Sequence, residues 1–193
     1  MLGEMLQNVR ENRPLVHCIT NYVTANDCAN LLLACGGSAI MADDMEEAEE
    51  VTSLCGGLVL NLGTPNPRKV EAMLRAGREA NRMGRPVVFD PVGVGCSAFR
   101  REASSRILEQ VQLSVIRGNA SEIAALTGGE TVADAYCGAG TITLALSDHA
   151  KKVLGAEIVP EAIDDARENA ARNGVKNAEF FCGDASDVAK KLA

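Results

Sequence analysis

The chain has 193 residues, which is long enough for one sizeable hydrophobic core and leaves room for two small domains. Its formal net charge of −7 argues against non-specific nucleic-acid binding, because that binding needs a basic surface to displace the counterions of the phosphates. We therefore expect a small-molecule ligand and no nucleic-acid partner.

The cysteines and the apolar runs indicate where the protein works. Seven cysteines are scattered without a Cys-X-X-Cys pair, which is typical of reduced thiols in the cytosol. The segment Met1–Glu4 lacks the basic region of a signal peptide, and no apolar run approaches the length that spans a membrane. We therefore expect a soluble cytoplasmic protein without membrane contact.

Short apolar runs typical of strands alternate with stretches of helical spacing along the whole chain. The predicted strands are Leu15–Ile19, Ser38–Met41, Leu58–Asn61, Pro86–Asp90, Leu113–Arg117, Thr131–Ala135, Lys152–Glu157 and Glu179–Cys182. Apolar strands that alternate with helices predict a mostly parallel sheet covered on both faces. We therefore expect an α/β fold, a Rossmann-like three-layer αβα sandwich around one sheet of about eight strands.

Cap residues define the ends of two predicted helices. In the first, Asn66 is a candidate N-cap, Pro67 takes the first helical position and Gly84 ends the helix. The second begins at Pro160 and ends at Gly174.

The alternation of strands and helices continues through the middle of the chain. A short predicted helix, Ser121–Leu126, leads through two glycines to the strand Thr131–Ala135, as a normal crossover does. There is no linker of low complexity at this point. We therefore expect residues 1–193 to form a single merged α/β domain.

Three stretches in the first part of the chain end predicted strands in polar or glycine-rich residues. They are Val16–Asn21, Asp90–Gly95 and Arg117–Glu122. In a parallel sheet these groups fall at the carboxyl ends of strands, where ligands bind in open α/β folds. An arginine, a helix N-terminus and acids that hold magnesium are the parts of a phosphate site. Alternatively, Asn119 only caps a helix and the glycines only make a turn.

These three stretches, Val-His-Cys-Ile-Thr-Asn, Asp-Pro-Val-Gly-Val-Gly and Arg-Gly-Asn-Ala-Ser-Glu, together resemble hydroxyethylthiazole kinase, a ribokinase-like family of thiamine biosynthesis. The resemblance covers about residues 1–129. It implies phosphorylation of the hydroxyl of a hydroxyethylthiazole by ATP with magnesium, in a trimer. It also implies that Met41 and Asn21 contact the thiazole. It implies further that Arg117 and Asn119 bind ATP and that Asp90 and Glu122 lie near the metal.

The same resemblance sets a limit on activity. The family's later segment supplies the glycine-rich anion hole, the base that activates the hydroxyl and much of the nucleotide pocket, and that segment does not follow Gly129. Phosphoryl transfer depends on positioning and charge stabilisation, so half a site loses nearly all of the rate. We therefore expect no kinase turnover.

The second part of the chain carries a different pattern. The strand Thr131–Ala135 carries an acid at its end and leads into a loop with Gly138 and Gly140, and a helix follows. Glycines let the backbone approach a ligand closely, and the helix offers its positive end. Glu157 ends the next strand, where a carboxylate accepts hydrogen bonds from ribose hydroxyls, and Asp184 follows the third. The pattern predicts an adenosine site, and the alternative is three ordinary strand ends.

The sequences Asp-Ala-Tyr-Cys-Gly-Ala-Gly-Thr and Glu-Ile-Val-Pro-Glu-Ala-Ile in this part resemble class I S-adenosylmethionine-dependent methyltransferases of the RNA uracil-5-methyltransferase type, over about residues 131–193. The resemblance implies that Asp134, Gly138 and Gly140 contact the methionine part of the cofactor. It also implies that Glu157 contacts the ribose and Asp184 the adenine amine. We interpret Cys137 as a half-exposed structural thiol and not as a nucleophile.

The catalytic parts of that family lie downstream of the matching region. They are a cysteine, a general base and an Asp-Pro-Pro motif, and the chain stops at Ala193 before any of them. The RNA-binding module is absent as well. We therefore expect no methyl transfer to RNA, and we assign no catalytic residue.

No single family explains both parts, so we interpret the chain as an engineered chimera that changes identity at Gly128–Thr131. Residues 1–129 form the kinase-like fragment and residues 130–193 the methyltransferase-like fragment. We expect weak S-adenosylmethionine binding without turnover. The alternative is a transferase that keeps thiazole-kinase-like binding or ATP-dependent phosphorylation, with oligomers through the kinase-like trimer surface. A third interpretation is a natural fusion or a mis-assembled gene.

Overall fold

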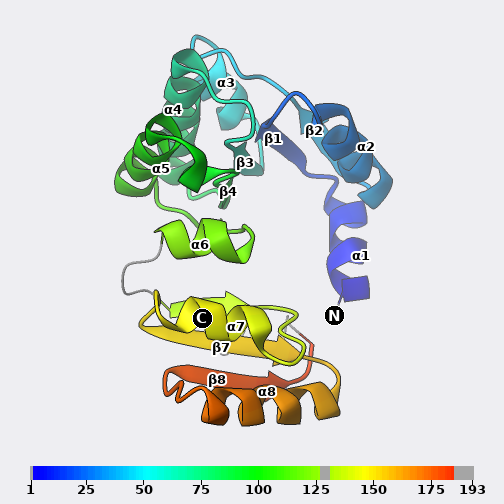
Figure 1. The fold of residues 1–193 in the computed structure, drawn as a ribbon. Helices are drawn as coiled ribbons and strands as arrows, with labels where there is room; N and C mark the ends of the chain where they lie inside the picture. Colours follow the sequence, from blue (N-terminus) through cyan, green and yellow to red (C-terminus); the bar gives the residue numbers. More distant parts are fainter. Residues whose placement is uncertain (1, 127–130, 185–193) are drawn as a thin grey trace. The chain divides into compact units, whose positions relative to one another are not determined.

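The computed structural model describes residues 2–126 and 131–184, and these form an α/β protein with parallel sheets flanked by helices (Figure 1). The α/β class is thus confirmed. All eight predicted strands are present, but they form two sheets, of five and three strands, so the prediction of one sheet is wrong. The fifth strand is only two residues long and offers few backbone groups to a further neighbour.

The chain divides into two compact units, a first unit of residues 1–118 and a second unit of residues 119–193. This boundary lies earlier in the chain than the predicted change of identity at Gly128–Thr131, of which residues 128–130 fall outside the described residues. No helix in the described ranges is long and apolar enough to cross a bilayer.

The five-stranded sheet of the first unit has the order β2-β1-β3-β4-β5, with every pair parallel. Its strands are β1 Leu15–Ile19, β2 Ser38–Ile40, β3 Gly57–Asn61, β4 Val87–Asp90 and β5 Val115–Ile116. Because the strands are parallel, their carboxyl ends meet at one edge of the sheet. This edge positions the first candidate site.

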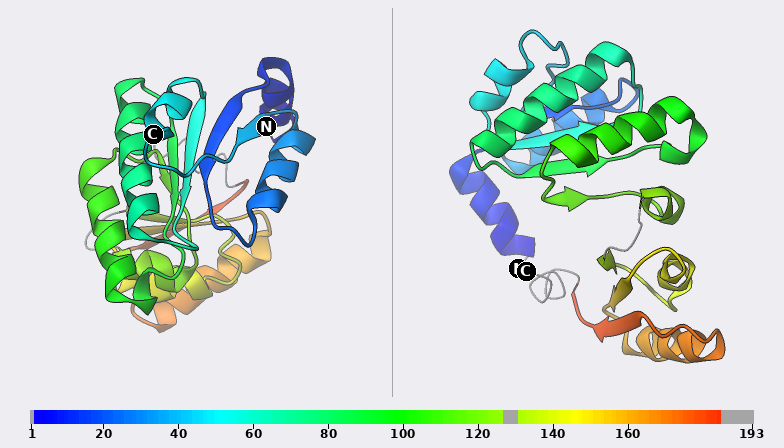
Figure 2. Two further views of the ribbon diagram at one scale, coloured as in Figure 1. Left: turned by 90° about the horizontal axis from the view of Figure 1, so that it is seen from above. Right: turned by 90° about the vertical axis from the view of Figure 1, so that its left-hand side faces the viewer.

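The helices of the first unit are α1 Leu2–Asn12, α2 Ala25–Cys35, α3 Ala48–Ser53, α4 Pro67–Arg82 and α5 Ala98–Gln110, with the 3-10 helix η1 at Val94–Cys96. Helices α4 and α5 lie side by side over β3 and β4 (Figures 1 and 2). Their apolar faces and these strands bury one core, which includes Leu60, Phe89, Met73, Leu74 and Ile107.

The predicted caps of α4 are confirmed. The Asn66 side chain accepts a hydrogen bond from the backbone nitrogen of Lys69 at 2.9 Å, and Pro67 starts the helix. Gly84 follows the helix with a φ of +64°, a left-handed conformation that favours glycine. Local cap chemistry therefore sets both ends of the helix.

The second unit contains α6 Ala120–Leu126, β6 Thr131–Asp134, α7 Thr141–Ser147, β7 Lys152–Glu157, α8 Pro160–Arg172 and β8 Ala178–Cys182. Its sheet has the order β6-β7-β8, again with parallel pairs. Helix α8 runs along β8 (Figure 1) and buries Ile163 and Ala166 against Phe180. Helix α6 packs in this unit as well, because Ile123 and Ala124 contact the cluster around Leu146.

Candidate functional site

A row of bonded side chains crosses the carboxyl edge of the five-stranded sheet. Asn21 Nδ2 donates to Asn61 Oδ1 at 3.1 Å, and Asn61 Nδ2 donates to Asp90 Oδ2 at 2.9 Å. Arg117 Nη1 lies 3.3 Å from the same carboxylate oxygen. The row therefore joins a predicted thiazole contact, a predicted metal residue and a predicted ATP contact.

The register of the sheet produces this row. Asn61 and Asp90 are the last residues of β3 and β4, and they are direct partners across the two strands. Gly63 N donates to Asn61 Oδ1 at 2.9 Å, and Thr24 N donates to Asn21 Oδ1 at 3.0 Å, so both amides are fixed in orientation. Asn61 was not predicted as a site residue from the sequence, although it ends a predicted strand, as Asp90 does.

Met41, the other predicted thiazole contact, follows β2 at the same edge. Its side chain is half-buried. The loop that carries it continues to Asp43, which bonds to the Tyr22 hydroxyl at 2.6 Å. The role of Met41 stays a prediction.

Asn119 and Glu122 form the N-terminal cap of α6. Asn119 N donates to Glu122 Oε2 at 2.9 Å, and Glu122 N donates to Asn119 Oδ1 at 3.0 Å, which is a reciprocal capping box. Both residues belong to the second unit, whereas Asp90 and Arg117 belong to the first. The geometry matches the helix-cap interpretation, and the roles in ATP and metal binding stay predictions.

A magnesium site of several acids is not assembled in the part of the chain that the structure describes. Within residues 2–126 and 131–184, no group of three or more His, Cys, Asp or Glu side chains could hold a metal ion. Asp90 instead accepts from Asn61 and pairs with Arg117. Both contacts are made to Asp90 Oδ2, and the role of Asp90 at a metal stays a prediction.

The second candidate site lies at the carboxyl edge of the three-stranded sheet and centres on Glu157. Gly138 N donates to Glu157 Oε2 at 3.2 Å, while the nitrogens of Ile158 and Val159 donate to Oε1 at 2.8 and 3.1 Å. The bond from Val159, with those from Ile158 and Gly138, lowers the pKa of Glu157. The carboxylate is therefore charged at neutral pH and suited to accept from hydroxyl groups.

The two glycines of the loop have different surroundings. A side chain at Gly138 would meet no atom within 4 Å, but its φ of +50° favours glycine, so the loop leaves open space there. A Cβ at Gly140 would lie 3.1 Å from Ala166 Cβ and 3.3 Å from the Phe180 ring. Gly140 thus permits close packing on α8, and its predicted cofactor contact stays a prediction.

The remaining predicted residues of this edge follow the other strands. Asp134 ends β6 and its Oδ2 accepts from Thr143 Oγ1 at 2.8 Å, and exposed Asp184 follows β8. Cys137 is buried, and not half-exposed as its place after a strand suggested, because it packs under α8 with Ile163. Burial raises the pKa of Cys137 to about 11, so the thiol is protonated at neutral pH and a poor nucleophile.

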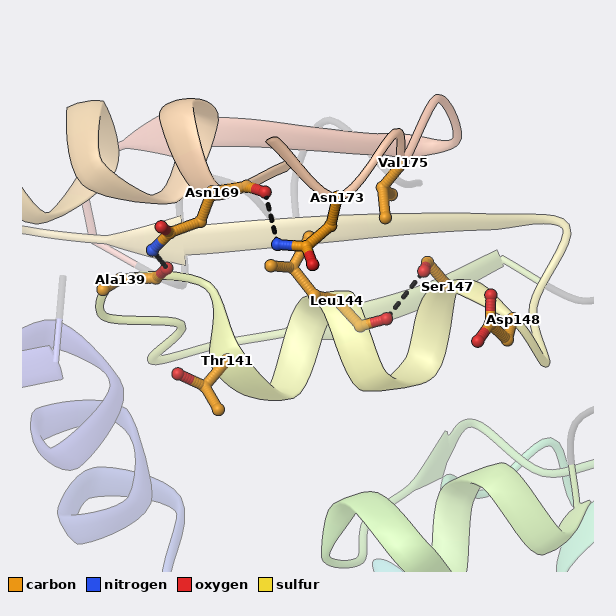
Figure 3. A pocket seen from close by; sticks show the side chains of 8 residues that line it. All are labelled: Ala139, Thr141, Leu144, Ser147, Asp148, Asn169, Asn173 and Val175. Carbon is orange, nitrogen blue, oxygen red and sulfur yellow. Dashed lines mark hydrogen bonds between the residues drawn. The ribbon is translucent and has the colours of Figure 1, made fainter. Parts of the chain in front are cut away.

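A groove of about 410 Å³ lies between α7 and α8 (Figure 3), and it is lined by residues of these helices and of their flanking loops, not by the acids that end the strands. Three of its polar side chains bond to backbone carbonyls within this small region. Asn169 donates to Ala139 O at 3.0 Å, Asn173 to Asn169 O at 2.8 Å, and Ser147 to Leu144 O at 2.6 Å. These bonds fix the groove wall, and we assign no ligand to it.

Two family models match the chain, and they overlap. A model described as the hydroxyethylthiazole kinase family matches residues 6–154, and a model described as a methyltransferase domain matches residues 126–193. The similarity to the kinase family thus continues beyond Gly129, through β6 and α7 to the start of β7. Residues 126–193 are a methyltransferase-like region, and residues 126–154 of it also belong to the kinase match.

Curated relatives match about two thirds of the chain. The hydroxyethylthiazole kinase of Clostridium acetobutylicum is 57% identical over 132 residues, which are 68% of this chain and 48% of that protein. The one of Desulfovibrio desulfuricans is 55% identical over 133 residues, 69% of this chain and 47% of that protein. The chain spans about half the length of the curated relatives that it matches.

A solved structure agrees with these relatives. The hydroxyethylthiazole kinase protein from Pyrococcus horikoshii OT3 has 46% sequence identity and a TM-score of 0.61, over 64% of this chain and 48% of that chain. The family match over residues 6–154 includes the sheet that carries the row from Asn21 to Arg117. The chain therefore belongs to the hydroxyethylthiazole kinase family.

Proposed function

We propose that the chain is an engineered chimera of two α/β fragments that binds S-adenosylmethionine weakly and turns over no substrate. The observation that carries the S-adenosylmethionine part of the proposal is the 3.2 Å hydrogen bond from Gly138 N to Glu157 Oε2. This bond sets an open glycine loop beside the acid that ends β7. Such a pair suits a nucleoside, because the loop admits the ligand and the carboxylate accepts hydrogen bonds from the ribose hydroxyls.

The residues present suit an adenosyl ligand. Glu157 would accept from the ribose hydroxyls, and the open space at Gly138 would admit the methionine part beside Asp134. Asp184 would accept from the adenine amine. The match of residues 126–193 to a methyltransferase domain model supports the same class of ligand.

The sheet order favours weak binding. In the described residues β6 is an edge strand, so no strand beyond it walls that side of the ligand. A site that encloses less of its ligand excludes less water and gains less from burial. We therefore expect S-adenosylmethionine and S-adenosylhomocysteine to bind without methyl transfer.

The absence of kinase turnover is proposed from the row at the first edge. Asp90, the residue expected near the metal, already pairs with Arg117, the residue expected at the phosphates, and accepts a hydrogen bond from Asn61. Phosphoryl transfer requires these charges to face the nucleotide.

The free state of every one of the seven cysteines supports a cytoplasmic setting for the protein.

Glu157→Ala tests the cofactor site by isothermal titration with S-adenosylmethionine and S-adenosylhomocysteine. The unaltered chain should release heat on binding, and the variant should bind roughly tenfold more weakly or worse, because hydrogen bonds to a charged group contribute about 1.5–3 kcal/mol. Glu161→Ala, an exposed acid at the start of α8, is the matched control and should bind as the unaltered chain does. No heat with the unaltered chain, or equal affinity in Glu157→Ala, would refute the site.

The row from Asn21 to Arg117 favours a second candidate function, in which the first unit keeps hydroxyethylthiazole and ATP binding with residual phosphorylation. Arg117→Ala should abolish ATP binding and any phosphorylated product detected by mass spectrometry, because Arg117 supplies the positive charge beside Asp90. Arg82→Ala, whose side chain pairs with Glu79 on α4, should leave both unchanged. Phosphorylation that survives Arg117→Ala would exclude this assignment. The candidate includes oligomers through the kinase-like trimer surface, which sedimentation velocity would detect.

A further inference from the structure

Lys69, near the start of α4, has a buried ammonium group that neither candidate site uses. Its side chain is 1% exposed, and Nζ donates to the carbonyl oxygen of Thr20 and, at 3.4 Å, to Thr64 Oγ1. Nζ also lies 3.7 Å from Asp43 Oδ2 and 4.2 Å from the centre of the Tyr22 ring. One ammonium group thus touches the segments that follow β1, β2 and β3.

Two further hydrogen bonds link the residues around this ammonium group. We name these residues the Lys69 cluster (Thr20, Tyr22, Asp43, Thr64 and Lys69). The Tyr22 hydroxyl donates to Asp43 Oδ2 at 2.6 Å, and Tyr22 N donates to Thr64 Oγ1 at 3.2 Å. Tyr22 itself stays 64% exposed, so its ring covers the ammonium group from the solvent side. The cluster therefore ties three loops together beneath one exposed aromatic ring.

Both predicted thiazole contacts lie on the loops that the cluster ties. Asn21 stands between Thr20 and Tyr22, and Met41 stands two residues before Asp43. We propose that Lys69 is a positioning residue that holds the segments after β1 and β2, so that Asn21 and Met41 present one surface to a neutral aromatic heterocycle of the thiazole type. The ligand in this proposal rests on the second candidate function, whereas the holding role rests on the cluster alone.

The chemistry of the cluster explains why the charge matters. A buried ammonium is costly unless it is paired and hydrogen-bonded, and here a carbonyl, a hydroxyl, a carboxylate and an aromatic face surround it. Burial lowers the pKa of Lys69, and the Asp43 carboxylate opposes that shift. Removal of the ammonium leaves the Thr20 carbonyl without this donor, while α4 keeps its cap because Asn66 bonds to the backbone of residue 69.

Hydrogen exchange measured by mass spectrometry tests the holding role in Lys69→Met. Amides of residues 20–24 and 41–45 should exchange at least tenfold faster, while those of β3, β4 and α4 keep their rates. Arg68→Met is the matched control, because Arg68 is the neighbouring cation, is exposed and pairs only at the surface with Asp44. Tyr22→Phe should give a smaller effect, because it keeps the ring over Lys69 and removes only the bond to Asp43.

Titration with hydroxyethylthiazole then separates the two parts of the proposal. If the unaltered chain binds, Lys69→Met should weaken binding about tenfold and Arg68→Met should not; equal affinity in Lys69→Met would overturn the positioning role. Unchanged exchange in Lys69→Met, or faster exchange throughout the first unit, would also overturn it. If the unaltered chain does not bind but exchange rises only in the two segments, the holding role stands and the thiazole candidate fails.

Discussion

His17 shows how burial sets the charge of a single side chain. The imidazole is fully buried in β1, with Nε2 2.7 Å from Ala42 O and Nδ1 2.8 Å from Thr52 Oγ1. Because a carbonyl only accepts, Nε2 carries the proton. Burial lowers the pKa of His17, and the bond to Ala42 and the charge of Glu47 only partly oppose this shift. The ring is therefore neutral in the folded chain at neutral pH.

This shift makes the stability of the first unit depend on pH. The unfolded chain takes up a proton at His17 near its ordinary pKa of 6.5, whereas the folded chain does so only at lower pH. The unfolded state then binds more protons, so the free energy of unfolding is full above pH 6.5 and falls as the pH drops toward the folded pKa. Urea unfolding between about pH 5 and 7 should show this slope.

His17→Gln should flatten that slope, because no titrating ring remains in the core. The control is His149→Gln, which removes the exposed histidine of the second unit and should keep the slope. Equal slopes in the two variants would show that His17 does not carry the pH dependence.

The residues of the sites differ in how far the sequence reveals them. Asp90 and Arg117 are predictable because each stands at the end of a predicted strand, within a stretch of sequence that resembles the kinase family. Asn61 and Lys69 are not, since their partners Asn21 and Thr20 lie 40 and 49 residues away in the chain. Such contacts arise only once the order of the strands is fixed.

At the scale of the elements, local signals were sufficient for type and position. The strands β1 and β7 begin and end as predicted, and the Asn66–Pro67 start of α4 follows from cap chemistry. Strand β5 is shorter than the predicted Leu113–Arg117, because it pairs only at Val115 and Ile116. Lateral pairing is non-local, so the number of sheets and the place of α6 could not be read from the pattern.

At the scale of the whole molecule, the two units bury separate cores. Ile163 is 1% exposed in a cluster of the second unit with Ala166, Ala170 and Phe180, and the described members of the first core all precede residue 118. Each unit therefore has its own source of stability, and a cavity in one core should act on that unit first.

Ile163→Ala should remove about 2–5 kcal/mol from the second unit through the lost contacts and the cavity. Hydrogen exchange should then show lost protection in β6, β7 and β8, while β1, β3 and β4 stay protected. Ile158→Ala, at a position 69% exposed, is the control and should leave both sheets protected. Simultaneous loss of protection in both sheets would mean that the units unfold as one.

The short outer strands of the two sheets have a consequence for the behaviour of the protein at high concentration. Strand β5, with two residues, is an edge strand of the five-stranded sheet, and β6, with four residues, is an edge strand of the three-stranded sheet. Each unpaired N–H and C=O on such a strand is a template for a strand of another copy, and natural proteins limit this risk by keeping edges short. Because β5 and β6 are short, they offer few backbone groups to a strand of another copy, and we expect these two edges to contribute little to fibril formation.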